Sequence, residues 1–224
     1  MKLKRGLIVS CQAVKGESLY NLGIMKYFAK AALDGGAVGI RCGVDDVVSI
    51  KEYLNNVPTI GLEKSTYESS SVYITPTKKE VDHLLATKTD VIALDATLRP
   101  RPNGETLEGL VAYIRSKDSE VEIMADIATL EEAVNAEKLG FDYIGCTLRG
   151  YTEETKGIEI PDFEFIKKLA STITKSKVIV EGGIWEKWQL EEVVKVNPYA
   201  VVIGSSITRP SDITKRFNSV MNLK

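Results

Sequence analysis

Residues 122–147, EIMADIATLEEAVNAEKLGFDYIGCT, carry the pattern of a strand, a helix and a second strand. The apolar runs 122–127 and 143–147 predict the strands. Thr129 followed by Glu132 is the pattern of a capping box, which predicts that a helix begins there. Both apolar runs are continuous rather than alternating with polar residues, as parallel strands covered on both faces require.

The same alternation continues along the whole chain. Further strands are expected at GLIVSC (6–11), AVGIRC (37–42), PTIGLE (58–63), DVIALDA (90–96), KVIVEG (177–182) and AVVIG (200–204). We expect a helix from Ser18 as the N-cap to Gly35 as the stop, and another over 161–172 with Pro161 in its first turn.

The number of strands indicates the architecture. Eight strand–helix units in 224 residues leave about 28 residues for each, the size of one βα unit. The sequence therefore predicts a (β/α)8 barrel of the α/β class, formed as a single domain by residues 1–224. A doubly wound open sheet is the alternative, but the glycine-rich fingerprint typical of that fold is absent after the first strand. The long irregular stretch 64–80 predicts a function or a lid.

Composition and charge disfavour several classes of partner. With 44% hydrophobic and 27% charged residues the chain predicts an ordinary folded domain. A net charge of -2 without a dense basic cluster disfavours nucleic acid and anionic membranes as partners. No apolar stretch approaches the ~20 residues of a membrane span, and the N-terminus lacks a signal-peptide core, so we expect a cytoplasmic protein.

Cysteine and histidine usage excludes further chemistry. The three cysteines have no CxxC spacing and His83 is the one histidine, so neither a disulfide framework nor a zinc site fits. A single imidazole also disfavours two-His metalloenzymes. For His83 itself, between apolar residues at helical spacing, we expect a surface or packing role.

Polar residues stand at the carboxyl ends of the predicted strands, where the active site of such a barrel lies. They are Gln12, Arg41, Lys64, Asp95, Asp126, Thr147, Glu181 and residues 204–206. Each also has a structural interpretation, since Asp95 and Asp126 can cap turns and Arg41 and Lys64 can neutralise carboxylates at the rim.

The last two strands end in EGGI and GSSI, small residues that let backbone N–H groups approach a ligand. These two loops commonly form the phosphate site of the barrel, so the pattern predicts a phosphorylated small molecule; two tight βα turns are the alternative. Lys64 and Glu181 indicate proton transfer, because a lysine near Arg41 can have a pKa low enough to act as a base. The leading reaction types are then removal of a proton from carbon or formation of a Schiff base.

At these residues the chain resembles the N-acetylmannosamine-6-phosphate 2-epimerases, phosphate-binding (β/α)8 barrels of bacterial sialic acid catabolism. The matching segments span nearly the whole chain: SCQA (10–13), GAVGIR (36–41), IGLEK (60–64), VYITPT (72–77), LDATLRPRP (94–102), MADIAT (124–129), DYIGCTLRGYT (142–152), VEGGI (180–184) and VIGSSITRP (202–210).

The resemblance implies that the chain interconverts N-acetylmannosamine 6-phosphate and N-acetylglucosamine 6-phosphate by inverting C2, without a cofactor or metal. It implies catalytic roles for Lys64 and Glu181, and contacts to substrate and phosphate by Gln12, Arg41, Asp126, Thr147, Arg209, Gly182, Gly183, Gly204 and Ser205. A homodimer is also expected. The chain departs from the family pattern at Glu63 and Ser65, beside the lysine, and at Gly183, where a basic residue is common.

Two other functions stay open at this point. The first is another phosphosugar isomerase barrel that shares the phosphate loops. The second is a barrel without catalysis that serves as a phosphosugar sensor or a structural subunit. The presence of both Lys64 and Glu181 disfavours the second, because a binding module needs the phosphate loops but no acid–base pair.

Overall fold

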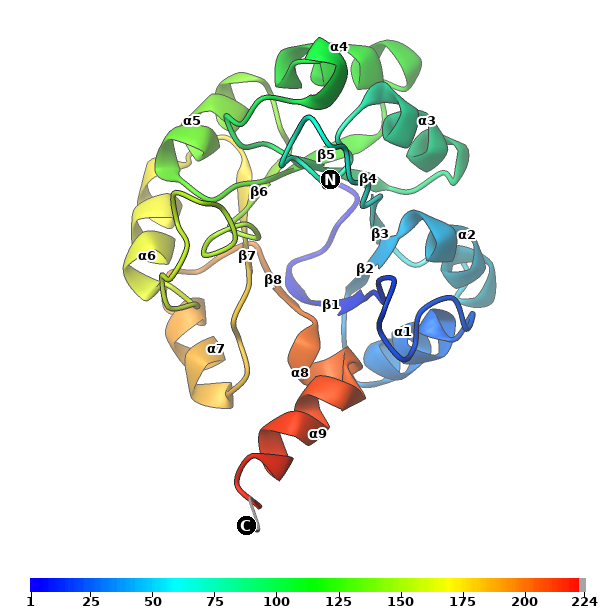
Figure 1. Ribbon diagram of the computed structural model, residues 1–224, viewed down its shortest axis with the longest axis vertical. Coiled ribbons are helices and arrows are strands. Elements are labelled where there is room, and N and C mark those ends of the chain that lie inside the picture. The colour runs from blue at the N-terminus through cyan, green and yellow to red at the C-terminus, as the bar shows by residue number, and fades with distance from the viewer. Residues whose placement is uncertain (222–224) are drawn as a thin grey trace.

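All eight predicted apolar runs form parallel strands, each paired with the next, and β8 pairs with β1 to close a barrel (Figure 1). The computed structural model describes residues 1–221, so the predicted domain of 1–224 ends three residues beyond them. The strands are β1 (Gly6–Cys11), β2 (Gly39–Gly43), β3 (Thr59–Leu62), β4 (Val91–Asp95), β5 (Glu122–Asp126), β6 (Tyr143–Gly145), β7 (Lys177–Glu181) and β8 (Ala200–Ile203). The described residues thus confirm the predicted (β/α)8 barrel.

Helices follow the strands and cover the outside of the barrel (Figure 1). They are α1 (Met25–Asp34), α2 (Val44–Tyr53), α3 (Lys78–Ala86), the 3-10 turn η1 (Pro102–Gly104), α4 (Leu107–Lys117), α5 (Leu130–Lys138), α6 (Phe163–Thr172), α7 (Lys187–Val194), α8 (Ser205–Thr208) and α9 (Pro210–Asn218). Over residues 1–221, none of them has both the length and the apolar character that crossing a membrane requires.

Two predicted helix starts are wrong. Ser18 does not cap α1, which begins only at Met25, because Asn21 and Gly23 with φ of 56° and 65° interrupt the helical path. Pro161 lies before α6 rather than in its first turn, because Asp162 is the N-cap and its side chain accepts a hydrogen bond from the Phe165 backbone N–H. The predicted capping box at Thr129 and Glu132 is confirmed at the start of α5.

Six strands also end one or two residues before the predicted limit, since the backbone leaves the ladder at the mouth of the barrel. The largest difference is in β6, which ends at Gly145 rather than at Thr147.

Alternation along the strands separates two apolar layers. On β5, Ile123 and Ala125 pack in the layer beneath the helices, while Met124 packs inside the barrel. Ile60 and Leu62 of β3 likewise point inward. Because side chains alternate with a period of two, the inward series continues into the polar residues at the strand ends.

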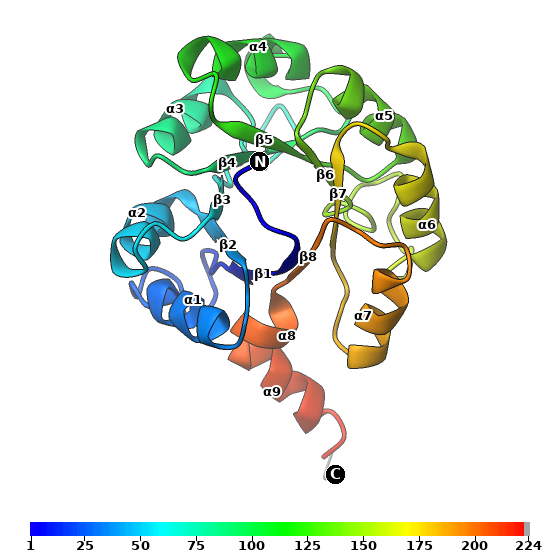
Figure 2. The ribbon, with the colours of Figure 1, turned by 180° about the vertical axis from the view of Figure 1, so that it is seen from behind.

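The N-terminal segment closes the floor of the barrel, at the amino ends of the strands (Figure 2). Leu3 is 2% exposed and packs against the inner core. Its backbone N–H donates to the Tyr143 hydroxyl at 3.3 Å, and its carbonyl accepts from the Tyr199 hydroxyl at 2.7 Å. The polar residues at the opposite end therefore face the open mouth.

Leu3→Ala should lower the free energy of unfolding by about 2 kcal/mol, because it leaves a cavity in the floor of the barrel where the leucine side chain had packed. Urea unfolding followed by circular dichroism measures the change. Lys4→Ala removes an exposed neighbour and is the control. Equal unfolding midpoints for Leu3→Ala and the wild type would show that the segment contributes nothing to the core.

Candidate active site

A cavity of about 340 Å³ opens at the mouth of the barrel, at the carboxyl ends of the strands. It brings together residues far apart in the sequence that the strand-end pattern and the resemblance had singled out. They are Gln12, Arg41, Lys64, Thr147, Glu181, Gly182, Gly183, Gly204, Ser205 and Arg209. Three residues named from the strand-end pattern, Asp95, Asp126 and Ser206, do not line this cavity. Asp126 lies beneath the cavity floor with no exposed surface.

A buried arginine occupies the base of the cavity. The side chain of Arg41 on β2 is 1% exposed and is bound by two hydrogen bonds to Asp126, Nη2 to Oδ2 at 2.7 Å and Nη1 to Oδ1 at 3.1 Å. Its Nη1 also lies 3.3 Å from Oε2 of Glu181. The Thr147 hydroxyl donates to Asp126 at 2.6 Å. Asp126 therefore orients Arg41 and Thr147 from below.

Lys64 follows the inward series of β3 and points into the cavity. Burial lowers the pKa of its ammonium group, and the positive charges of Arg41 and Arg209 lower it further. A lowered pKa increases the fraction of a lysine that is neutral, and the neutral form is the one that accepts a proton.

Glu63, the first departure beside Lys64, points away from the cavity. Its carboxylate lies 2.9 Å from Nδ1 of His83 on α3, outside the barrel. The side chain of His83 is 48% exposed, which agrees with the expected surface role. The charges that shift the pKa of Lys64 most are those of Arg41, Arg209, Glu181 and Glu17.

Glu181 faces Lys64 from β7, with 14% of its side chain exposed. Burial raises the pKa of its carboxyl group to about 7, an effect that Arg41 opposes and Asp126 reinforces. Near neutral pH this group can both donate and accept a proton. Together with Lys64 it gives the cavity a pair of groups suited to proton transfer.

Small residues of the EGGI and GSSI segments also line the cavity. Gly182 and Gly183 have φ of 118° and 74°, a region that favours glycine. A Cβ on Gly183 would lie 2.4 Å from the carbonyl carbon of Ile160, so a side chain does not fit there. At Gly183, where the family often has a basic residue, only the backbone can therefore contact a ligand.

Arg209 contributes a cation to the cavity lining. Its Nη1 lies 3.2 Å from Oε1 of Glu17, a residue in the loop between β1 and α1. Asp95, by contrast, bonds to Thr97 and Arg99 beside the site, which agrees with its interpretation as a turn cap.

Several cavity residues were missed by the reasoning from the sequence: Ser10, Tyr73, Tyr151 and Trp185. Tyr73 lies in the irregular stretch 64–80, whose length was a signal of function. Burial and the charge of Asp126 raise the pKa of its hydroxyl to about 12, so it is a hydrogen-bond donor at neutral pH. Tyr151 and Trp185 gave no comparable signal, because single aromatic residues in loops are common.

The chain has relatives among known proteins. Residues 25–223 match the sequence profile of the N-acetylmannosamine-6-phosphate epimerase family. Proteins of Staphylococcus aureus provisionally named N-acetylmannosamine-6-phosphate 2-epimerase are 50% identical over 222 residues, 98% of this chain and 99% of the relative.

Solved structures give the same result. The structure of the N-acetylmannosamine-6-phosphate 2-epimerase from Clostridium perfringens has a TM-score of 0.90 and 47% identity, covering 96% of this chain and 92% of the other. Thiamine phosphate pyrophosphorylase from Pyrococcus furiosus matches with a TM-score of 0.63 and 19% identity, over 96% of this chain and 91% of the other. The second match shows a shared fold only.

The raised pKa of Glu181 predicts a pH dependence of stability. Between pH 4.5 and about 7 the folded carboxyl holds its proton while the unfolded one loses it, so the folded state binds more protons. The stability from this group is therefore lost as pH rises through that window, on the order of 1 kcal/mol per pH unit.

We expect Glu181→Gln to remove the pH-dependent contribution of this carboxyl group to stability. The difference in unfolding free energy between variant and wild type should therefore grow from pH 5 to pH 7.5. Urea unfolding at several pH values measures it. Glu153→Gln, at a side chain 91% exposed, controls for the loss of a carboxylate. A difference that does not change with pH would mean that Glu181 titrates like an exposed acid.

Proposed function

The chain belongs to the N-acetylmannosamine-6-phosphate epimerase family, and we propose that it interconverts N-acetylmannosamine 6-phosphate and N-acetylglucosamine 6-phosphate by inverting C2. One observation carries the assignment of residues. Lys64 and Glu181 line a single cavity together with the glycine loops and Arg209. An acid–base pair and an anion-binding end in one cavity are what a phosphosugar epimerase needs.

The substrate lies with its phosphate on the loops after β7 and β8. Backbone N–H groups of Gly182, Gly183, Gly204 and Ser205 and the guanidinium of Arg209 bind this group. The sugar then extends toward Arg41, where the proton-transfer groups are. Gln12, whose side chain donates to Ser10 at 2.8 Å, and Thr147 contact the sugar hydroxyls or the N-acetyl group.

The reaction requires an acidic C2 hydrogen, which the ring form of the sugar does not have. In the open-chain aldehyde, Lys64 takes the C2 proton, and the electron pair of the C–H bond forms a C1=C2 double bond with negative charge on the oxygen of C1. Arg41 stabilises that charge. Glu181 assists ring opening or returns a proton to the opposite face of C2.

Lys64→Ala should lose at least about 10²-fold in rate, because the general base is gone, while the affinity for inorganic phosphate changes little. Lys64→Arg should not restore the rate, because a guanidinium stays protonated and cannot accept the C2 proton. Exchange of the C2 hydrogen in deuterated water, followed by NMR, is the measurement. If Lys64→Ala exchanges C2 as fast as the wild type, the lysine is a rim charge and the assignment is wrong.

We propose that the protein works in the cytoplasm as a homodimer. Helix α9 projects from the barrel in both views (Figures 1 and 2), and none of its residues is buried. Phe217 in its last turn and Val220, two residues beyond its end, are 72% and 85% exposed. A groove of about 370 Å³ also lies open beside β8, lined by Leu7, Leu190, Val194, Pro198, Tyr199 and Val201 among others. A second copy would cover both apolar surfaces.

Phe217→Asp should therefore give a particle with the mass of one chain, where the wild type has the mass of two, because a charge on a buried apolar contact disfavours association. Light scattering after gel filtration measures both. Ser211→Asp adds the same charge to the same helix at an exposed polar position and should keep the dimer. A wild type that is monomeric at micromolar concentration would contradict this part of the proposal.

A further inference from the structure

Residues 70–76 form a segment that returns across the mouth and enters the gap between β3 and β4. It is called the wedge below. Ile74 pairs with Lys64 in an antiparallel bridge, and the Thr75 N–H donates to the Glu63 carbonyl at 2.7 Å. On its other side the Asp95 N–H donates to the Ile74 carbonyl at 2.9 Å. The wedge therefore connects the backbone of Lys64 to the end of β4.

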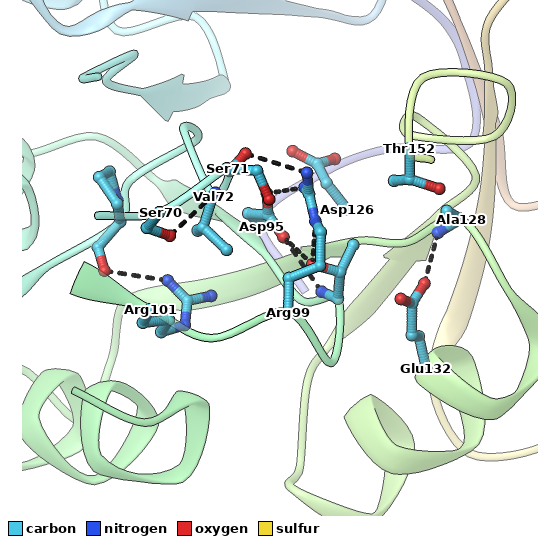
Figure 3. A network of polar contacts seen from close by, with 12 residues as sticks. Ser70, Ser71, Val72, Asp95, Arg99, Arg101, Asp126, Ala128, Glu132 and Thr152 are labelled. Carbon is cyan, nitrogen blue, oxygen red and sulfur yellow. Dashed lines mark hydrogen bonds and ion pairs between the residues drawn. The ribbon is translucent and has the colours of Figure 1, made fainter. Parts of the chain in front are cut away.

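Arg99, in the loop after β4, clamps the wedge from outside. Its Nη1 donates to the Ser71 carbonyl at 2.9 Å, its Nη2 to Asp95 Oδ2 at 2.6 Å and its Nε to the Thr97 hydroxyl at 2.9 Å. Figure 3 shows the guanidinium between Ser71 and Asp95, two groups from different elements. Because Asp95 is fully buried, it is a fixed anchor for this arginine.

Two more contacts hold the ends of the wedge. The Ser70 hydroxyl donates to the Pro100 carbonyl at 2.6 Å, and Arg101 donates to the Pro76 carbonyl at 3.1 Å. Both come from the loop after β4 that carries Arg99. The loop thus fixes the wedge at its first two residues and at its last one, on both sides of Tyr73.

Two residues of the wedge line the cavity: Ile74, which is buried in the inner core, and Tyr73, which carries the polar group. Its ring packs against the inner core of the barrel and it lines the cavity at the end where Arg41 lies. Asp126 and Asp95 act on its hydroxyl by their charge. Among residues 1–221 this hydroxyl has no hydrogen-bond partner, so its donor is available to a ligand.

We propose that the Tyr73 hydroxyl donates a hydrogen bond to the sugar at its reacting end, and that Arg99 is the positioning residue that holds Tyr73 there. The inference rests on the proposed epimerase function, which places the reacting carbon at the Arg41 end of the cavity. A neutral donor at this place stabilises negative charge on the oxygen of C1 as it develops. Arg99 contributes without contacting the substrate.

Tyr73→Phe tests the first half of the proposal. The ring stays, so the fold and the packing are preserved, and only the donor is removed. We expect kcat to fall about 10- to 10²-fold, while the inhibition constant of inorganic phosphate changes less than about twofold. An unchanged kcat with wild-type C2 exchange would overturn the role of Tyr73 and leave the epimerase assignment intact. A wild type without C2 exchange would instead overturn the proposed function.

Arg99→Lys tests the second half. A lysine keeps the positive charge beside Asp95 but cannot bind Asp95, Thr97 and Ser71 together. We expect kcat to fall about tenfold with little change in phosphate inhibition. Arg115→Lys is the matched control, since Arg115 also joins a carboxylate and a carbonyl, Asp142 at 2.8 Å and Val121 at 2.6 Å, at the floor of the barrel. It should lower the thermal midpoint without lowering kcat.

The double variant separates positioning from general destabilisation. Once the hydroxyl is absent, misplacing it costs nothing more, so Arg99→Lys should reduce kcat much less in the Tyr73→Phe background than in the wild type. If the fold-loss of kcat in the double variant equals the product of the two single losses, the positioning role of Arg99 is overturned. A kcat loss in Arg115→Lys equal to that of Arg99→Lys would overturn it as well, because it would trace the effect to stability alone.

Discussion

The ion pair between Arg41 and Asp126 is the constraint on which the site depends. A guanidinium inside a barrel is tolerated only when its charge is compensated, and removing one partner of such a pair costs about 3–5 kcal/mol. Arg41 is compensated twice, by Asp126 at 2.7 Å and by Glu181 at 3.3 Å. The same charge lowers the pKa of Lys64 and opposes the rise in the pKa of Glu181. One buried cation therefore acts on the pKa of both groups that are proposed to act on the substrate, in addition to burial, which is the larger cause for each.

The geometry of this cluster follows from the barrel. Side chains alternate along each strand, so the inward series that contains Leu62 on β3 and Met124 on β5 also contains Lys64 and Asp126. Residues one position away face the helices instead. This explains why Glu63, adjacent to Lys64 in sequence, pairs with His83 outside the barrel.

The sequence was sufficient to predict the strands, the barrel and the residues that meet at its mouth, because these depend on local apolar runs and on the rule that strand ends share one rim. The sequence was insufficient where tertiary contacts determine the start of a helix or the position of a side chain. Ser18 is a good cap by composition, but backbone conformations at Asn21 and Gly23 delay the helix to Met25. The depth of Asp126 below the cavity depends on its bonds to Arg41 and Thr147. Tyr73 is brought to the site by contacts between two loops, which no periodicity in the sequence records.

The closed floor has a consequence for immobilising or fusing this protein. The amino group of Met1 lies 3.2 Å from Glu122 at the amino end of β5, so a linker added before Met1 would leave from the side opposite the cavity. A surface or carrier attached there would keep the mouth turned toward the solution and accessible to a diffusing sugar phosphate. A linker at the other terminus would instead continue from α9 and the exposed apolar residues at its end. The two ends of the chain thus offer very different attachment points.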